Sequence, residues 1–271
     1  MSYFQDGENV QMKKSDDRHK ILISVISIGA VLLIWFLATN VGSIPTIILP
    51  KPQDVWNSFV TLCRDGYGTN KDTLMVHMMA SMKRLLIAYG LSVITAVPIG
   101  LLCGYFPKVS SIVTPFVEFY RPIPPLAYYT LLVLWLGINE ESKIMLLFLA
   151  GFAPIFISCV SGVKRISADY LNASYMLGAN KRQTFMNVIL PASLPDIFTG
   201  LRTAIGFEYT TLVAAEMVAA KQGIGWMVLD ASNWLKSEVV FAGVIVMGLT
   251  GILLTTIVML LEKKFVHWAG K

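Results

Sequence analysis

Apolar residues along the chain gather in long runs, and polar segments separate these runs. The first run, Ile21–Ala38, contains eighteen residues without a charge. A helix of that length is about 27 Å long, enough to cross the hydrocarbon layer of a bilayer. The run is longer than the apolar core of a signal peptide, and Ala38-Thr39-Asn40 is a poor cleavage site. We therefore expect an uncleaved first span.

Five further apolar segments predict five more spans, and with them an all-α bundle of six transmembrane helices. The segments are Leu85–Phe106, Pro122–Ile138, Ile144–Val163, Thr203–Ala220 and Val239–Leu261. Within the first of them, Gly100 and Gly104 form a GxxxG pair, which lets a neighbouring helix approach closely.

Prolines mark the beginning of the shortest segment. Pro122, Pro124 and Pro125 remove backbone donors at a membrane entrance. Irregular backbone at membrane depth is tolerated where it is buried in protein or borders a cavity. The prolines therefore indicate either a pathway near this entrance or a simple helix N-terminus.

Between the first two spans, residues 40–82 form a mixed segment. Asp54–Cys63 has apolar residues at helical spacing, and Trp56 is of a type that lies among lipid headgroups. The pattern fits a short interfacial helix and also fits a plain surface loop.

The longest polar interruption of the second half covers residues 164–195. Ser167 or Asp169 can cap a short helix that runs through Ala173 to Leu177, and Gly178 follows where a left-handed turn would end it. Asn180 and Gln183 have the spacing of a capping box for a second helix, which Pro191 would help to stop. Two short helices joined at a glycine predict a docking element.

Composition and charge indicate a membrane protein and give it an orientation. The chain is 55% hydrophobic and 14% charged, against roughly 25% charged in an average soluble domain. With the N-terminus inside, twelve Lys and Arg fall on inner segments and six on outer ones, and positive residues favour the cytoplasmic side. The inner twelve are Lys13, Lys14, Arg18, Lys20, Lys108, Lys164, Arg165, Lys181, Arg182, Lys263, Lys264 and Lys271; the outer six are Lys51, Arg64, Lys71, Lys143, Lys221 and Lys236; Lys83, Arg84, Arg121 and Arg202 lie at span edges and are left out. We expect a multi-pass protein of the cell (cytoplasmic) membrane with both termini and the 164–195 loop in the cytoplasm.

The 164–195 loop also carries most of a known signature. Importer-type permeases of ATP-binding-cassette (ABC) transporters have a cytoplasmic Glu-Ala-Ala-x3-Gly-x9-Ile-x-Leu-Pro motif. At the same spacing this chain matches in Ala173, Gly178, Leu190 and Pro191, and departs in Asn172, Ser174 and Val188. The chain therefore resembles these permeases. Asn172 has no acidic group, so the resemblance does not imply an ion pair from that position to the ATPase.

Further motifs are similar to the nitrate, sulfonate and taurine branch of these permeases, over residues 75–270. They are Glu118–Ala127, Leu134–Ile138, Leu190–Pro195, Thr199–Arg202, Thr211–Glu216, Gly223–Val228 and, most like taurine permeases, His267–Gly270. The resemblance implies a type I ABC importer permease fold and import of taurine or a related sulfonate. Nitrate, bicarbonate and aliphatic sulfonates are the alternative substrates.

The resemblance also implies partners and a coupling role for the loop. The family combines two permease copies, two copies of a separate ATPase and an extracytoplasmic substrate-binding protein. The residues that we expect to couple to the ATPase are Asn172, Ala173, Ser174, Leu177, Gly178, Ala179, Leu190 and Pro191.

Two carboxylates stand out in the Thr203–Ala220 span. A charge inside the membrane is costly, so such residues face a bundle interior or an aqueous path. Glu216 belongs to the family pattern and Glu208 departs from it, and at eight residues apart they lie about 80° apart around a helix. The alternative to a path is a structural pair with Arg202, Arg121 or a donor on another helix. The candidate lining of a translocation path is Glu208, Tyr209, Thr210, Thr211 and Glu216.

The sequence carries no sign of chemistry of its own. It lacks the Gly-x4-Gly-Lys-Ser/Thr loop that binds ATP phosphates, its three histidines are isolated, and its three cysteines have no CxxC spacing. We expect a transport subunit that is not an enzyme, that has no cofactor or metal, and that binds lipid and not nucleic acid. A passive channel and an integral-membrane enzyme are the less favoured alternatives.

The expected organisation is one membrane domain with short flanking segments. These are a cytoplasmic N-terminal tail (1–20), the first span (21–38), an external loop (39–74), the permease domain (75–265) with its coupling loop (164–195), and a cytoplasmic C-terminal tail (266–271).

Overall fold

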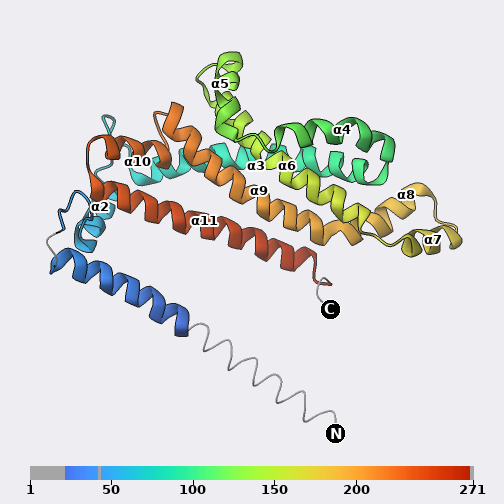
Figure 1. Cartoon of the computed structure of the whole chain (residues 1–271), viewed down its shortest axis with the longest axis horizontal. Coiled ribbons are helices and arrows are strands. Elements are labelled where there is room, and N and C mark those ends of the chain that lie inside the picture. Colours follow the sequence, from blue (N-terminus) through green and yellow to red (C-terminus); the bar gives the residue numbers. More distant parts are fainter. Residues whose placement is uncertain (1–21, 42–43, 269–271) are drawn as a thin grey trace, which may run out of the picture.

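The computed structural model describes residues 22–41 and 44–268, and this part of the chain is built from helices (Figure 1). Its described residues form no strand, only an isolated bridge between Tyr67 and Asp72. The helices are Leu22–Asn40, α2 (Pro52–Arg64), α3 (Leu74–Tyr105), α4 (Pro107–Tyr120), α5 (Pro125–Leu136), α6 (Glu140–Lys164), α7 (Ala168–Met176), α8 (Lys181–Thr184), α9 (Leu190–Ala219), α10 (Ile224–Asn233) and α11 (Ser237–Phe265). The predicted all-α class is confirmed.

Five of the described helices are long and apolar enough to cross a membrane. They are Leu22–Asn40, α3, α6, α11 and a continuous helix, Lys181–Ala219, that contains α8 and α9. The twelve-residue α5 is a sixth, shorter apolar helix. The predicted bundle of six spans is therefore confirmed in outline.

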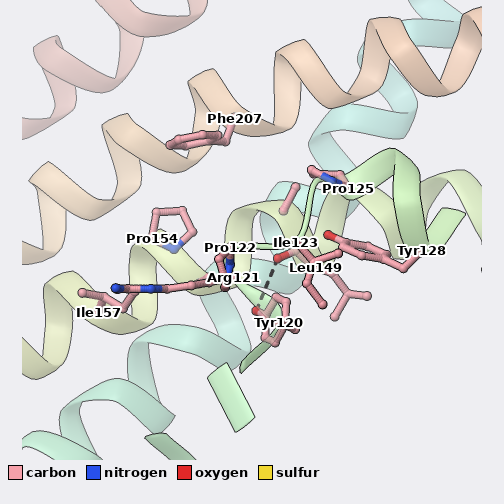
Figure 2. Close-up of a pocket in the computed structure, with 12 residues that line it drawn as sticks. Tyr120, Arg121, Pro122, Ile123, Pro125, Tyr128, Leu149, Pro154, Ile157 and Phe207 are labelled. Atoms are coloured by element: carbon pink, nitrogen blue, oxygen red, sulfur yellow. Dashed lines mark hydrogen bonds between the residues drawn. The ribbon is translucent and has the colours of Figure 1, made fainter. Parts of the chain in front are cut away.

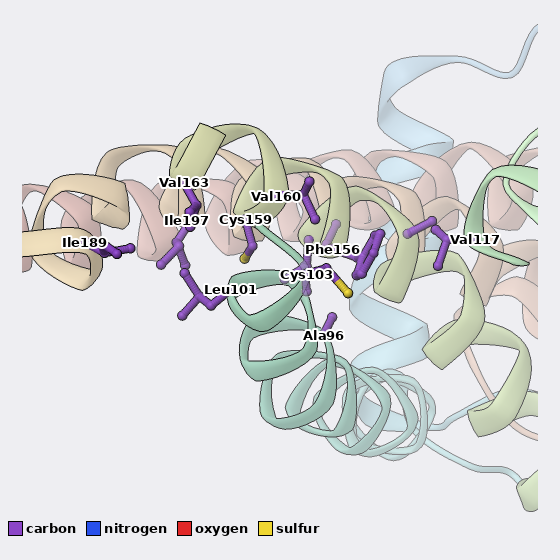
Figure 3. Packing of buried hydrophobic residues seen from close by; sticks show 13 residues of the cluster. Ala96, Leu101, Cys103, Val117, Phe156, Cys159, Val160, Val163, Ile189 and Ile197 are labelled. Atoms are coloured by element: carbon purple, nitrogen blue, oxygen red, sulfur yellow. The ribbon is translucent and has the colours of Figure 1, made fainter. Parts of the chain in front are cut away.

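The centre of the bundle is α6, which packs against both α3 and α9 (Figure 1). Buried residues of all three helices, among them Phe156 and Cys159, form one apolar core (Figure 3). A Cβ on Gly100 would collide with Cys159, and a Cβ on Gly104 would collide with Val163. Because only glycine fits at these two contacts, the predicted close approach at the GxxxG pair is confirmed.

The sequence pattern does not predict α4 or α10. Only Phe106 separates α4 from α3. The new helix begins at Pro107, whose fixed φ suits the first helical position. With fourteen residues α4 is too short to span a bilayer, and it turns back along α3 (Figure 1). Neither helix is an apolar run of membrane length, which is the pattern that predicts a span.

At the other end of α3, α2 confirms the helical alternative for Asp54–Cys63, and its Trp56 is 65% exposed. The loop after α2 reaches α10, where the Tyr67 hydroxyl donates to the Asp230 carboxylate at 2.8 Å. Burial, and then the hydrogen bond and charge of Asp230, raise the pKa of the Tyr67 phenol. Tyr67 therefore remains a donor at neutral pH and keeps α10 in place.

Candidate docking and translocation site

The polar loop contains two short helices, as its sequence predicts. The Ser167 side chain caps α7 by accepting from the Asp169 N–H at 3.2 Å. Asn180 and Gln183 form a capping box at the start of α8, with both hydrogen bonds at 2.9 Å. Gly178 joins the helices with a φ of 81°, a left-handed conformation that glycine adopts without strain. The predicted caps and glycine turn are confirmed.

The predicted stop at Pro191 is wrong. α8 continues through a π-helical turn, Phe185–Ile189, directly into α9. A proline inside an α-helix lacks an N–H and clashes with the carbonyl four residues back. The π turn, which ends two positions before Pro191, is wider and holds an extra residue, which relieves this conflict. Lys181–Ala219 is consequently one helix of 39 residues, about 58 Å long.

The two short helices form a tip at the end of the molecule away from α2 and α10 (Figure 1). Met176 and Leu177 are 88% and 89% exposed there. Ser174 points inward, and its hydroxyl lies 3.1 Å from that of Thr184. The tip, residues 167–184, is thus held together from inside and offers apolar side chains to its surroundings. Of the other predicted coupling residues, the exposed ones are Asn172, Ala173 and Gly178, and the half-buried ones are Ala179, Leu190 and Pro191.

Glu216 is completely buried near the end of α9 that lies opposite the tip. Its Oε1 accepts from Ser81 Oγ and Arg84 Nη1, both at 2.7 Å, and its Oε2 accepts from the Gly225 N–H at 2.9 Å. Arg84 also donates to Glu140 through Nε at 2.5 Å and through Nη2 at 3.0 Å. One ionic cluster therefore joins α3, α6, α9 and the start of α10.

The chain folds closely over this carboxylate. A Cβ on Gly223 would collide with the Glu216 carboxylate, and Gly223 has a φ of 133°. The Gly223 N–H donates to His77 Nδ1 at 3.2 Å, and the Ile224 N–H donates to Ser81 Oγ at 3.0 Å. These bonds fasten the start of α10 to α3 and cover Glu216.

Glu208 is also completely buried, farther along α9 toward the tip. Ser92 of α3 donates to its Oε1 at 2.8 Å. Its Oε2 has no hydrogen-bond partner among the residues that the structure describes. On the α6 side the carboxylate fills the space over Gly151, where any Cβ would overlap it. The Glu208 side chain therefore lies at the meeting point of α3, α6 and α9.

The three other candidate path residues have different surroundings. The Tyr209 hydroxyl donates to the Met247 carbonyl of α11 at 2.9 Å. Thr211 is buried, whereas Thr210 is exposed. In this conformation Glu208 and Glu216 reach separate clusters, and the role of all five residues along a translocation path stays a prediction.

Replacing Gly151 by alanine should destabilise the protein by about 1–3 kcal/mol, because overpacking a dense core costs that much. The atoms that the new Cβ would overlap belong to the completely buried Glu208 side chain, which would have to shift. Removing it in Gly151→Ala/Glu208→Ala should recover much of the loss. The measurement is the melting temperature in detergent, with Gly206→Ala as control, since nothing lies within 4 Å of a Cβ there. Equal melting of the Gly151→Ala and Gly206→Ala proteins would contradict the close contact.

A cavity of about 310 Å³ lies beside the break between α4 and α5 (Figure 2). Its lining comes from the segment that contains Pro122 and Pro125, from α6 between Leu149 and Ile157, and from Phe207. The Tyr120 hydroxyl donates to the Leu149 carbonyl at 3.3 Å and so ties the end of α4 to α6. The irregular proline segment therefore does border a cavity.

Comparison with known proteins establishes the family. Residues 96–268 match the family described as "Binding-protein-dependent transport system inner membrane component". The chain belongs to this family. It is 38% identical over 252 residues to the taurine transport system permease protein TauC of Escherichia coli (strain K12), which covers 93% of this chain and 91% of TauC. It is 32% identical over 250 residues to the nitrate import permease protein NrtB of Synechocystis sp., or 90% of this chain and 89% of NrtB.

A solved structure supports the fold of this inner membrane component. A chain of the MetNI methionine ABC transporter, solved in inward-facing conformations, matches with a TM-score of 0.59 and 15% identity over 71% of this chain and 94% of that one. Family membership makes the protein a multi-pass transport permease subunit, and it implies an ATPase partner and a substrate-binding protein. The predicted family, fold and kind of function are confirmed.

The sequence does not predict the polar face of α3, which contacts both Glu208 and Glu216. His77, Ser81, Arg84 and Ser92 follow one another at intervals of four, three and eight residues. Such intervals place side chains on one helix face, and this spacing is the signal that would have located them. Arg84 stands at the edge of the predicted span, where its charge resembles a topology marker.

Proposed function

We propose that the chain forms the translocation path for taurine or a related sulfonate, and that a separate ATPase drives it through the tip. The observation that carries the proposal is the exposed apolar pair Met176 and Leu177 on the motif-bearing loop, since exposed apolar patches mark interaction sites. The likeness to TauC, at 38% identity over 93% of the chain, supports the substrate.

The connection between tip and membrane core supports a mechanism. α8 continues into α9, and α9 carries both buried carboxylates. Closure of the ATPases on ATP would push on residues 167–190, and the Lys181–Ala219 helix would carry that movement to Glu208 and Glu216. The ionic cluster and the contact over Gly151 would then rearrange as the spans switch from outward- to inward-facing.

We also infer that the tip and both termini are cytoplasmic and that two permease copies work with two ATPases. The excess of Lys and Arg on the segments that the sequence predicts to be cytoplasmic, twelve against six, supports the orientation. The family resemblance supports the stoichiometry and the absence of ATP hydrolysis in this chain. In this scheme residues 75–265 form the permease domain and residues 164–195 its coupling loop.

A nitrate, bicarbonate or aliphatic-sulfonate permease is the second candidate. Its support is the likeness to NrtB, which at 32% identity is only slightly lower than the likeness to TauC. Both candidates import small anions or zwitterions, so the two share the coupling mechanism and differ in substrate.

The test is uptake into liposomes that contain the chain together with its ATPase and binding protein. We expect labelled taurine to enter only with ATP, and we expect alkanesulfonates to compete where nitrate does not. ATPase stimulation by the binding protein without taurine uptake would reject the substrate and keep the transporter. Taurine uptake that needs neither ATP nor the ATPase would instead indicate a passive channel.

A further inference from the structure

We propose that Arg121 forms an anion-binding subsite for the transported substrate, in the cavity beside the α4–α5 break (Figure 2). The identity of the anion as a sulfonate rests on the proposed function. The existence of the subsite rests on the depth of the cavity along α6, the unpaired charge of Arg121 and the residues that line the cavity.

The cavity lies at mid-depth along α6 and opens to the surface of the protomer, where Arg121 is exposed. Its α6 lining runs from Leu149 to Ile157, whereas α6 extends from Glu140 to Lys164. At 1.5 Å per residue this lining begins about 13 Å from one end of α6 and ends about 10 Å from the other. Because the hydrocarbon layer is about 30 Å thick, the cavity and Arg121 fall within it.

Arg121 has no counter-ion among the described residues. Its guanidinium has no ion pair within 4.0 Å and no side-chain hydrogen bond there, whereas Arg84, Arg165 and Arg202 each hold a carboxylate. The nearest carboxylate along the chain, Glu118, lies one turn earlier on α4 and does not line the cavity. The charge on Arg121 is therefore unbalanced in this protomer.

An unbalanced charge at this depth points to a substrate path. Ionisable side chains inside the hydrocarbon layer face a bundle interior or a water-filled cavity, and they mark the routes of ions and substrates. Among the residues that the structure describes, no carboxylate lines this cavity, so the potential that Arg121 creates there favours an anion. A guanidinium also presents several donors in a fixed fork, which suits an anion with more than one oxygen.

The rest of the lining suits a small organic anion. Figure 2 shows Arg121 and Tyr128 on the same cavity, and the Tyr128 hydroxyl has no hydrogen-bond partner among the described residues. Prolines 122, 125 and 154 supply apolar surface. Small-ligand sites combine a few polar groups with apolar walls, in volumes from about 300 Å³ upward. A sulfonate can place its oxygens at Arg121 and its short carbon chain against the prolines.

The test compares the rates at which an anionic and a cationic reagent label a thiol in the cavity. Ala150 is a half-buried lining position, and Ala150→Cys places a thiol there. In the complex embedded in nanodiscs, this thiol is reacted with anionic sulfonatoethyl methanethiosulfonate and, separately, with the cationic trimethylammonium analogue. We expect Arg121→Gln to lower the anion-to-cation ratio of labelling rates at least about tenfold, since the lost charge attracts one reagent and repels the other. Arg121→Lys should keep most of the ratio.

An internal reference makes this result specific. The native Cys63 is exposed on α2, and Cys103 and Cys159 are buried. Peptide mass spectrometry separates the labelled thiols, and the ratio at Cys63 should not change in Arg121→Gln. An unchanged ratio at the cavity thiol would overturn the proposal. So would a cavity thiol that neither reagent reaches, because a sulfonate could not reach it either.

Transport separates this inference from the proposed function. Arg121→Gln should reduce taurine uptake at least about tenfold while the loaded binding protein still stimulates the ATPase. Uptake at the wild-type rate would reject Arg121 as a substrate contact and keep the importer. A charge-selective cavity in a wild-type complex that imports no taurine would keep the subsite and reject the substrate. Loss of complex assembly with an unchanged labelling ratio would assign Arg121 to a contact between permease copies and overturn the subsite.

Discussion

Leu177→Asp is expected to abolish ATP-dependent uptake and to leave the membrane domain folded. The side chain is 89% exposed, so a carboxylate there costs the permease itself little stability. In a docked complex the same position would lose its water, and removing a central anchor of an interface costs about 2 kcal/mol or more, or about thirtyfold in affinity. The measurements are copurification of the ATPase and uptake in liposomes.

Leu235→Asp is the matched control for this substitution. Leu235 is also an exposed leucine, at 67%, but it follows α10 at the end of the molecule away from the tip. Its φ of 55° is one that aspartate tolerates. This control should bind the ATPase normally. If Leu177→Asp kept its ATPase as the control does, the docking surface would have to lie elsewhere on the chain.

Glu216→Gln is expected to lower the free energy of unfolding by about 3 kcal/mol. Breaking a buried ion pair leaves a charge without a partner, and this is the usual size of the penalty. Arg84 keeps Glu140, but that carboxylate is 53% exposed and cannot replace the fully buried one. The same substitution also turns an acceptor of the Gly225 N–H and the Ser81 hydroxyl into an amide that satisfies them less well. Thermal unfolding in detergent measures the effect.

A double-mutant cycle separates the free energy of the Arg84–Glu216 charge pair from the general loss of stability that each substitution causes. Arg84→Met should also destabilise the protein, while Arg84→Met/Glu216→Gln should be more stable than the sum of the single losses predicts, because neither charge is then unpaired. Glu262→Gln is the control, since it breaks the half-buried pair with Arg202 and should cost less than about 1 kcal/mol. Additive single losses would mean that Arg84 and Glu216 do not stabilise the fold as a pair.

The features that the sequence predicts correctly are those that depend on neighbours along the chain. The capping box at Asn180 and Gln183, the cap at Ser167 and the turn at Gly178 each involve residues within four positions of one another. Apolar runs likewise locate the long helices, because membrane depth fixes their minimum length.

The features that it does not predict depend on distant partners. Glu216 and Arg84 are 132 positions apart, and the sequence leaves Arg202, Arg121 and a donor on another helix as alternatives. Only the packed bundle decides among them, giving Arg202 to Glu262 and Arg84 to Glu216. α4 is missed for another reason: it neither spans the bilayer nor has the polarity of a loop, so no length or composition pattern identifies it.

The number of residues in the π turn at Phe185–Ile189 determines the direction in which the tip points around the axis of α9. A π turn holds one residue more than a regular α-helix would need, and each residue of an α-helix rotates the chain by about 100°. Without that one residue, α7 would swing about 100° around the axis of α9 although no tip residue had changed. The phase of the tip relative to the membrane core is therefore set by the length of this segment, and not by the side chains that meet the partner.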